Sequence, residues 1–214
     1  MSSPLSPKTL KGGIVLLDPV SSAVQKIIPL QYNPEKISRS LQPQGPGEGS
    51  GQASAMRLVG PPVETYTIEA EIDATDFLEV EDRQTLEEGL QPALAVLEAI
   101  VYPKSSKLVA NNKLAAAGSL EILPEESPLV LFIWSKNRVM PVLITEFSIT
   151  EEAFDANLNP IRAAISLSLR VLNVNDLGFE HKGGNLYMAY HQQKEQLANK
   201  YTSGNLGTLG QNSI

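Results

Sequence analysis

Two long segments of alternating apolar and polar residues, joined by a short loop, constrain the fold of this chain more than any other feature. The first is RVMPVLITEFSITEEAF (138–154), and the second is RAAISLSLRVLNV (162–174). Alternation with a period of two is typical of strands that bury one face, and the loop DANLNP between the segments is rich in turn-forming residues. The pair therefore predicts a β-hairpin. Pro141 lacks an amide donor, which indicates an edge position or a bulge.

Further strands are predicted at residues 13–18, 24–32, 64–73 and 127–135. In the third of these, Tyr66, Ile68, Ala70 and Ile72 face one way, and Thr65, Thr67, Glu69, Glu71 and Asp73 face the other. A helix is predicted to begin near Gln91 and to end at Tyr102-Pro103, because Pro92 is tolerated only in a first turn. The fold class is therefore mainly β (α+β).

The chain divides into a β domain over residues 10–180 and a C-terminal helix and tail over residues 185–214. The helix is predicted to be capped by Asn185, with Leu186, Tyr190, Leu197 and Tyr201 near one stripe. A stripe that contains Tyr187, Tyr190 and Tyr201 is suited either to docking on a partner or to packing against its own domain.

One stretch inside the β domain has a different composition. Residues 43–62, PQGPGEGSGQASAMRLVGPP, contain five glycines and four prolines, too little apolar surface to offset their ordering entropy alone. We expect a flexible loop there. Just before it, Tyr32-Asn33-Pro34 ends the second predicted strand, because Pro34 fixes φ and Asn33 readily opens a turn.

Composition excludes several classes of function. The chain has 24 acidic and 17 basic residues and a net charge of -7, which disfavours binding of nucleic acid or an anionic membrane surface. No apolar run reaches the ~18 residues of a membrane-spanning helix, so no membrane insertion is expected. The start of the sequence lacks the pattern of a signal peptide. Without cysteines the chain forms neither disulfides nor thiolate metal sites.

The densest set of carboxylates, EAEIDATDFLEVED (69–82), has two readings. A small-ligand or cation-binding β-barrel would use it as a site, since hard cations bind several oxygens, but the spacing of a calcium loop is missing. The favoured reading is a solvated strand face and helix N-terminus. His181 and His191 match no zinc spacing, and neither a nucleophile elbow nor a phosphate loop is present. The sequence therefore predicts no catalytic residue, no metal ligand, no cofactor and no enzymatic activity.

Four segments in collinear order resemble one known family, and together they span roughly residues 10–195. They are LQYNPEKISRSL, RLVGPPVETYTIEAEIDATDFLE, LQPALAVLEAIVYP and FIWSKNRVMPVLITEFSITEEAFDANLNPIRAAISLSLRVLN. They resemble the N-terminal domain of contractile-injection-system tube proteins, which are baseplate hub or tube-adaptor subunits of phage-tail-like particles. Larger members carry a LysM-type module after the C-terminal helix; the sequence ends at Ile214, so we expect neither that module nor glycan binding.

The resemblance implies a tube-like β-sandwich or barrel with one flanking helix and a C-terminal helix, six copies of which form a ring around a lumen. The ring would lie between a trimeric spike and the inner tube, contact other baseplate subunits and initiate the tube. An inner-tube subunit or a tube cap of the same particle is the alternative. Assembly would take place in the cytoplasm of a bacterium.

Particular residues follow from this expectation, and the loop over residues 43–62 would become ordered between subunits of the ring. The predicted subunit-interface residues are Tyr32, Asn33, Pro34, Arg57, Tyr187 and Tyr190. The predicted lumen-facing residues, on the polar faces of the long strands, are Glu69, Glu71, Ser166, Ser168 and Arg170.

Overall fold

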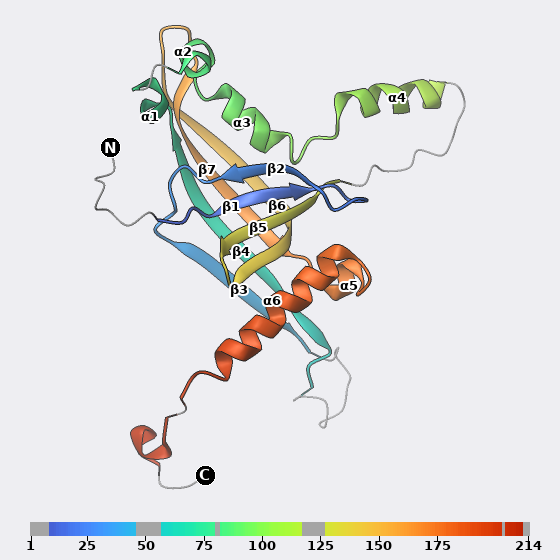
Figure 1. Cartoon of the computed structure of the whole chain (residues 1–214), viewed down its shortest axis with the longest axis vertical. Helices are drawn as coiled ribbons and strands as arrows, with labels where there is room; N and C mark the ends of the chain where they lie inside the picture. Colours follow the sequence, from blue (N-terminus) through green and yellow to red (C-terminus); the bar gives the residue numbers. More distant parts are fainter. Residues whose placement is uncertain (1–8, 46–56, 80–81, 117–126, 203, 212–214) are drawn as a thin grey trace.

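Seven antiparallel strands form one sheet in this computed structural model, which describes residues 9–45, 57–79, 82–116, 127–202 and 204–211 (Figure 1). The strands are β1 (Gly13–Leu17), β2 (Val24–Pro29), β3 (Ile37–Gln44), β4 (Gly60–Asp73), β5 (Leu129–Ser135), β6 (Arg138–Phe154) and β7 (Pro160–Val171). Their order is β2-β1-β5-β6-β7-β4-β3. The expected mainly β (α+β) class is confirmed. Among the described residues the sheet is open, with β2 and β3 as its two edges, and not a closed barrel.

The sheet encloses its core by folding over on itself. Figure 1 shows β1, β2 and β5 crossing over the long strands β4, β6 and β7. The rings of Tyr66 in β4 and Phe132 in β5 lie with their centroids 6.1 Å apart. The largest fully buried side chains come from both parts of the sheet: Tyr66, Phe132, Ile14, Ile68, Met140, Leu169, Val142 and Pro141.

The predicted hairpin is confirmed as β6 and β7, and its register contains a β-bulge. Ile144 lies opposite Leu169 and Glu146 lies opposite Ser168, so Thr145 is one extra residue in β6. Because of this extra residue, Ile144 and Phe147 both pack against the core although they are three positions apart.

The predicted edge position of Pro141 is wrong, since β6 lies between β5 and β7. The bulge is at Thr145, not at Pro141. The Pro141 carbonyl accepts a hydrogen bond of 2.9 Å from the Leu172 amide, one residue beyond the end of β7. The missing N–H therefore removes only the final bond of the β6–β7 ladder, which makes the proline tolerable in a central strand.

The expectation of one flanking helix is wrong, because the described residues between β4 and β5 form four helices. They are α1 (Thr75–Leu78), α2 (Arg83–Glu88), α3 (Gln91–Glu98) and α4 (Ser105–Ala116). The helix predicted from Gln91 is α3; it has Pro92 in its first turn and buries Leu94 and Leu97. It ends at Glu98, earlier than predicted. The start of α2 is capped by Asp82, whose carboxylate accepts from the Thr85 amide.

After β7 come α5 (Val174–Leu177), α6 (Lys182–Ala198) and a short 3-10 helix, η2 (Leu206–Leu209). The predicted cap at Asn185 is wrong: His181 caps α6, and its Nδ1 accepts from the Gly183 amide at 3.0 Å. The predicted stripe is also wrong, because Leu197 and Tyr201 are exposed. The buried residues of α6 are Gly183, Gly184, Tyr187 and Tyr190.

The predicted loop over residues 43–62 is too long. Residues 43 and 44 are the end of β3, and residues 60–62 are the start of β4. Strand β3 itself was not predicted. Residues 46–56, on which the expectation of flexibility falls, lie outside the described residues. The predicted strand at 24–32 ends at Pro29.

A candidate assembly surface

One face of the sheet points away from the core and carries hydroxyls and carboxylates across β4, β6 and β7. Glu69 lies opposite Ser166, and Ser166 lies opposite Ser148 of β6. One rung further, Ser168 lies opposite Thr67 and Glu146, and its hydroxyl donates to Glu146 at 3.2 Å. We call this surface the polar sheet face. It carries all the residues predicted to face a lumen: Glu69, Glu71, Ser166, Ser168 and Arg170.

Arg170 is fixed at one end of the polar sheet face by α5. Its guanidinium donates to both carboxylate oxygens of Asp176, at 3.0 and 3.2 Å. Asp176 also accepts from the Asn173 amide, as part of the capping box that starts α5. The charge of Arg170 is thus paired within the chain, and the other four residues of the set give the face its acidic and hydroxyl character.

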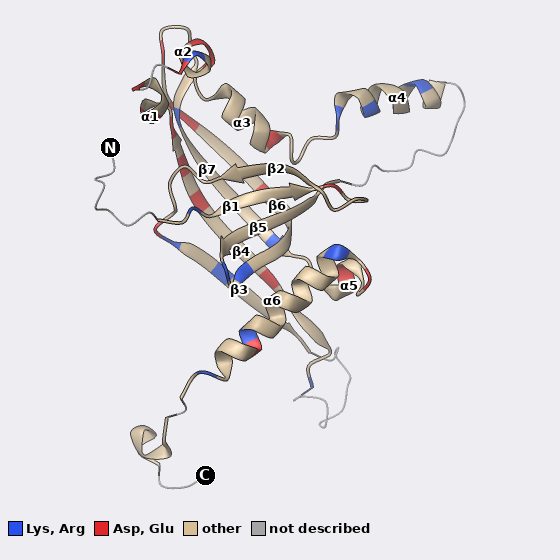
Figure 2. Ribbon diagram, viewed as in Figure 1, with Lys and Arg blue, Asp and Glu red and all other residues tan. Residues whose placement is uncertain are grey.

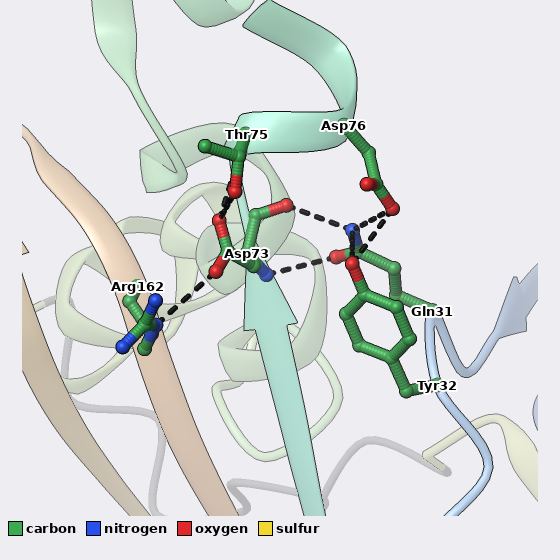
Figure 3. A network of polar contacts seen from close by, with 6 residues as sticks. All are labelled: Gln31, Tyr32, Asp73, Thr75, Asp76 and Arg162. Atoms are coloured by element: carbon green, nitrogen blue, oxygen red, sulfur yellow. Dashed lines mark hydrogen bonds and ion pairs between the residues drawn. The ribbon is translucent and has the colours of Figure 1, made fainter. Parts of the chain in front are cut away.

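The Tyr-Asn-Pro loop lies at the other end of this surface, against the end of β4 (Figure 3). The Tyr32 hydroxyl donates to the Asp76 carboxylate at 2.7 Å, and this bond holds the Asp76 pKa below its ordinary value. The same contact raises the pKa of Tyr32. Tyr32 is therefore a neutral donor to a charged carboxylate, which is one of the stronger kinds of hydrogen bond.

Gln31 joins the loop to the backbone of β4. Its side-chain amide accepts from the Asp73 amide at 2.9 Å and donates to the Asp73 carbonyl at 2.8 Å (Figure 3). The side chain thus pairs with both backbone groups of one residue, as a neighbouring strand would. The Asp73 carboxylate, in turn, accepts from the Thr75 hydroxyl and amide and from Arg162, and these bonds hold its pKa below the ordinary value.

Asn33 ties the loop to the segment before β1. Its side-chain oxygen accepts from the Gly12 amide at 2.9 Å, and its nitrogen donates to the Leu10 carbonyl at 2.7 Å. The prediction that Asn33 opens a turn was incomplete, because its amide also fixes a segment about twenty residues earlier. These contacts lie within one chain; whether Tyr32, Asn33, Pro34 and the exposed Arg57 meet another subunit stays a prediction.

A groove brings two of the predicted sets together. It has a volume of about 640 Å³ and lies between the Tyr-Asn-Pro loop and the polar sheet face. Tyr32, Asn33 and Pro34 line one side, and Glu69 and Glu71 are among those that line the other. Acidic residues are spaced along the long strands in Figure 2. This closeness was not predictable from the sequence, because 35 positions separate Pro34 from Glu69.

The tyrosines of α6 pack against their own domain, which is one of the two alternatives open from the sequence. The Tyr190 hydroxyl donates to Glu64 Oε1 at 2.8 Å, and Lys194 Nζ donates to Glu64 Oε2 at 2.7 Å. Glu64 is only 3% exposed. Desolvation, followed by the hydrogen bond to Tyr66 and the charge of Glu64, raises the pKa of Tyr190 far above its ordinary value.

Tyr187, which is also buried, stacks on His191 with the ring centroids 6.1 Å apart. Sequence reasoning missed the role of Glu64. Glu64 lies two positions before Tyr66 and four before Ile68, so it shares their face of β4. A glutamate among residues that face the core was the sequence signal for this buried role.

Other predicted features have local roles. His181 caps α6, and His191 lies 3.6 Å from Glu195 on the same helix. No group of three or more His, Cys, Asp or Glu side chains that could hold a metal ion is found within the described ranges. In the same part of the chain, no helix has the length and apolar character needed to cross a membrane.

No protein-family model matches the chain, and a search of curated proteins finds no match either.

Proposed function

We propose that this chain is a structural subunit of a contractile injection system, a baseplate hub that forms a ring between the central spike and the inner tube and initiates the tube. The proposal rests on the sequence resemblance together with one structural observation: a single antiparallel sheet that is open at both edges and polar on one face. The chain would act without catalysis, in the cytoplasm of a bacterium, as part of a phage-tail-like particle.

The open edges supply the contacts that a ring needs. β2 and β3 are the outermost strands, and most of their residues are exposed. An edge strand presents unpaired N–H and C=O groups, which natural proteins cover, blunt or pair. In the proposed hexamer, neighbouring copies would cover these open edges, and the six sheets would join into one continuous barrel.

The polar sheet face suits the inside of such a barrel. Its hydroxyls and carboxylates tolerate water, whereas the opposite face buries Tyr66, Ile68 and Leu169. In a barrel with a wide interior, the inner face is polar because it lines an aqueous channel. Glu69, Glu71, Ser166, Ser168 and Arg170 would then line the lumen.

An inner-tube subunit or a tube cap would form the same kind of ring. These alternatives differ from the hub only in their position in the particle. Locating the subunit in a density map of the whole particle separates these roles: contact with the spike trimer on one side and the tube on the other supports the hub.

A small-ligand or cation-binding protein is the second candidate, favoured by the groove that Glu69 and Glu71 line. Calorimetry with calcium and magnesium tests it. Heat that saturates at low millimolar ion would support cation binding. No heat at these concentrations would rule out cation binding as the function.

Light scattering of the purified protein and negative-stain imaging test the ring. We expect a species with the mass of six chains and ring-shaped particles with a central channel. A strictly monomeric protein that is also absent from isolated baseplates would overturn the proposal.

A further inference from the structure

Helix α4 has no covering partner in the described part of the chain. None of its twelve residues is buried, and Figure 1 shows it standing away from the sheet. Leu108 is 54% exposed and Val109 is 55% exposed. An isolated helix shorter than about 12 to 15 residues is marginal in water, so a helix of this length needs tertiary contacts to persist. A surface on another molecule would supply these tertiary contacts.

An apolar groove flanks the C-terminal end of α3. It consists of two adjoining cavities of about 440 and 620 Å³, and Val101 and Ile144 line both. Phe147 adds to the first cavity and Val142 to the second. Glu98 at the end of α3 and the residues just after it form one wall of the groove, and residues of β6 form the other. We call it the α3–β6 groove.

The charges of α4 and of this groove are opposite. Residues 99–116 include Lys104, Lys107 and Lys113 and no acidic residue. The groove carries Glu98 and Glu146 in its first cavity. Pairing of α4 with a second α4 would bring like charges together, whereas docking in the α3–β6 groove brings opposite charges together. The charge pattern therefore favours a contact between two different surfaces of the same chain.

We propose that α4 of one copy docks in the α3–β6 groove of a second copy. Leu108 and Val109 enter the groove, and Ala115 and Ala116 follow two turns later on the same side of the helix. Each copy then offers one helix and one groove, a head-to-tail arrangement that closes into a ring when the rotation between copies allows it. The inference rests on the proposed ring, because the ring supplies the second copy, and it adds the contact that joins neighbours outside the sheet.

Disulfide trapping tests the contact directly, since the chain contains no cysteine. A Leu108→Cys protein is mixed with a differently tagged Thr145→Cys protein, in which the new thiol lies in the groove. Mild oxidation should give a mixed disulfide dimer. The control Ala110→Cys, at an exposed position about 160° around the helix from Leu108 and about 100° from Val109, should give about tenfold less dimer. Thr150→Cys is the control in β6, because Thr150 lines the groove beside the Tyr-Asn-Pro loop instead.

Three outcomes separate the contact from the ring. A Leu108→Cys/Thr145→Cys double variant that forms its disulfide within one chain, with no mixed dimer, overturns the contact. A ring seen by light scattering without a mixed dimer overturns the contact and leaves the ring. A monomer without a mixed dimer overturns both. As a second measurement, Leu108→Glu/Val109→Glu should weaken association between copies about tenfold, which corresponds to about 1.4 kcal/mol, and Ala110→Glu should leave it unchanged. Equal association for both variants contradicts the proposal.

Discussion

The phenol oxygens of Tyr66 and Tyr190 lie 2.9 Å apart, although 124 residues separate them in sequence. Tyr66 belongs to the central part of β4, and Tyr190 belongs to α6, so the contact joins the C-terminal helix to the core of the sheet. Glu64 accepts from Tyr190 on the same side, and Lys194 lies 4.1 Å from the centre of the Tyr190 ring. A buried carboxylate with these partners fixes where α6 can lie on the sheet.

Replacing Tyr190 with phenylalanine should destabilise the fold by about 1–3 kcal/mol, because the Tyr66 hydroxyl and the Glu64 carboxylate each lose a buried partner. Urea unfolding monitored by circular dichroism measures the change. Tyr201→Phe is the matched control, because Tyr201 is 82% exposed. Loss of its hydroxyl should change the free energy of unfolding by less than about 0.5 kcal/mol. Equal stability of the two variants would contradict the described role of Tyr190.

Tyr190 should also make stability fall at alkaline pH. Its folded-state pKa is raised above the ordinary 10.0, so the unfolded chain loses this proton first. The stabilisation is complete below pH 10 and is lost as pH rises toward the folded-state pKa, with a slope of at most about 1.4 kcal/mol per pH unit. In Tyr190→Phe the decline should be shallower. It should not vanish, because Tyr187 and Tyr32 also have raised pKa values. Unfolding free energies on both sides of pH 10 check this, and identical slopes in the two proteins would contradict it.

Gln31→Ala should cost about 1–2 kcal/mol, because both backbone groups of Asp73 lose a hydrogen bond at a partly buried position. Urea unfolding gives the free energy. Gln192→Ala, at an exposed position of α6, is the control and should change it by less than about 0.5 kcal/mol. A Gln31→Glu variant would keep one acceptor for the Asp73 amide but place a third carboxylate beside Asp73 and Asp76. It should not restore the stability of the parent protein.

Gly184→Ala should destabilise the chain, although alanine favours a helix over glycine by about 1 kcal/mol. The added methyl group would collide with the Gly178 carbonyl oxygen, which is backbone and cannot rotate away. We expect a net loss of about 1–3 kcal/mol in the free energy of unfolding. Gly204→Ala is the comparison, because the nearest atom to its methyl group is Thr208 Oγ1 at 3.7 Å. If Gly184→Ala were as stable as Gly204→Ala, the close approach of α5 and α6 would be wrong.

A cysteine at Glu69 tests the direction of the polar sheet face. In the proposed ring the thiol lies in the lumen, so a small maleimide should react at a rate similar to that in the monomer, whereas a maleimide on a large polymer should react about tenfold or more slowly. Ala110→Cys, on the side of α4 away from Leu108 and Val109, should react with both reagents. Fast reaction of Glu69→Cys with the large reagent in assembled rings would place this face outside.

The strands with strong alternation were predictable, and the elements held by distant contacts were not. The β6–β7 hairpin and β4 were found because each buries one face, which sets a period of two in their sequences. β3 was missed because Ser38 and Ser40 are polar and exposed and Pro43 lies near its end. Pairing with β4 stabilises this strand more than its own residue preferences do.

The candidate surface was predictable in part for the same reason. Alternation placed Glu69 on the polar side of its strand and Ser166 and Ser168 on the polar side of theirs, and the register of β4 with β7 puts all three on one face. The partners of Tyr32 and Asn33 were not accessible, because Asp76 and Gly12 lie in segments that only the tertiary fold brings near the loop. α4 escaped detection since its apolar residues form no continuous stripe and it makes no buried contact of its own.

The extra residue at Thr145 shifts the alternation of side chains in β6 by one position. Before it, even-numbered residues such as Val142 and Ile144 point to the core, and after it, odd-numbered residues such as Phe147 and Ile149 do. Loss of this one residue would exchange the two faces of everything that follows in the strand, and glutamate, serine and threonine would enter the core. Over evolutionary time, the strand can therefore change its amino acids far more freely than its length: insertions and deletions survive in pairs, or not at all.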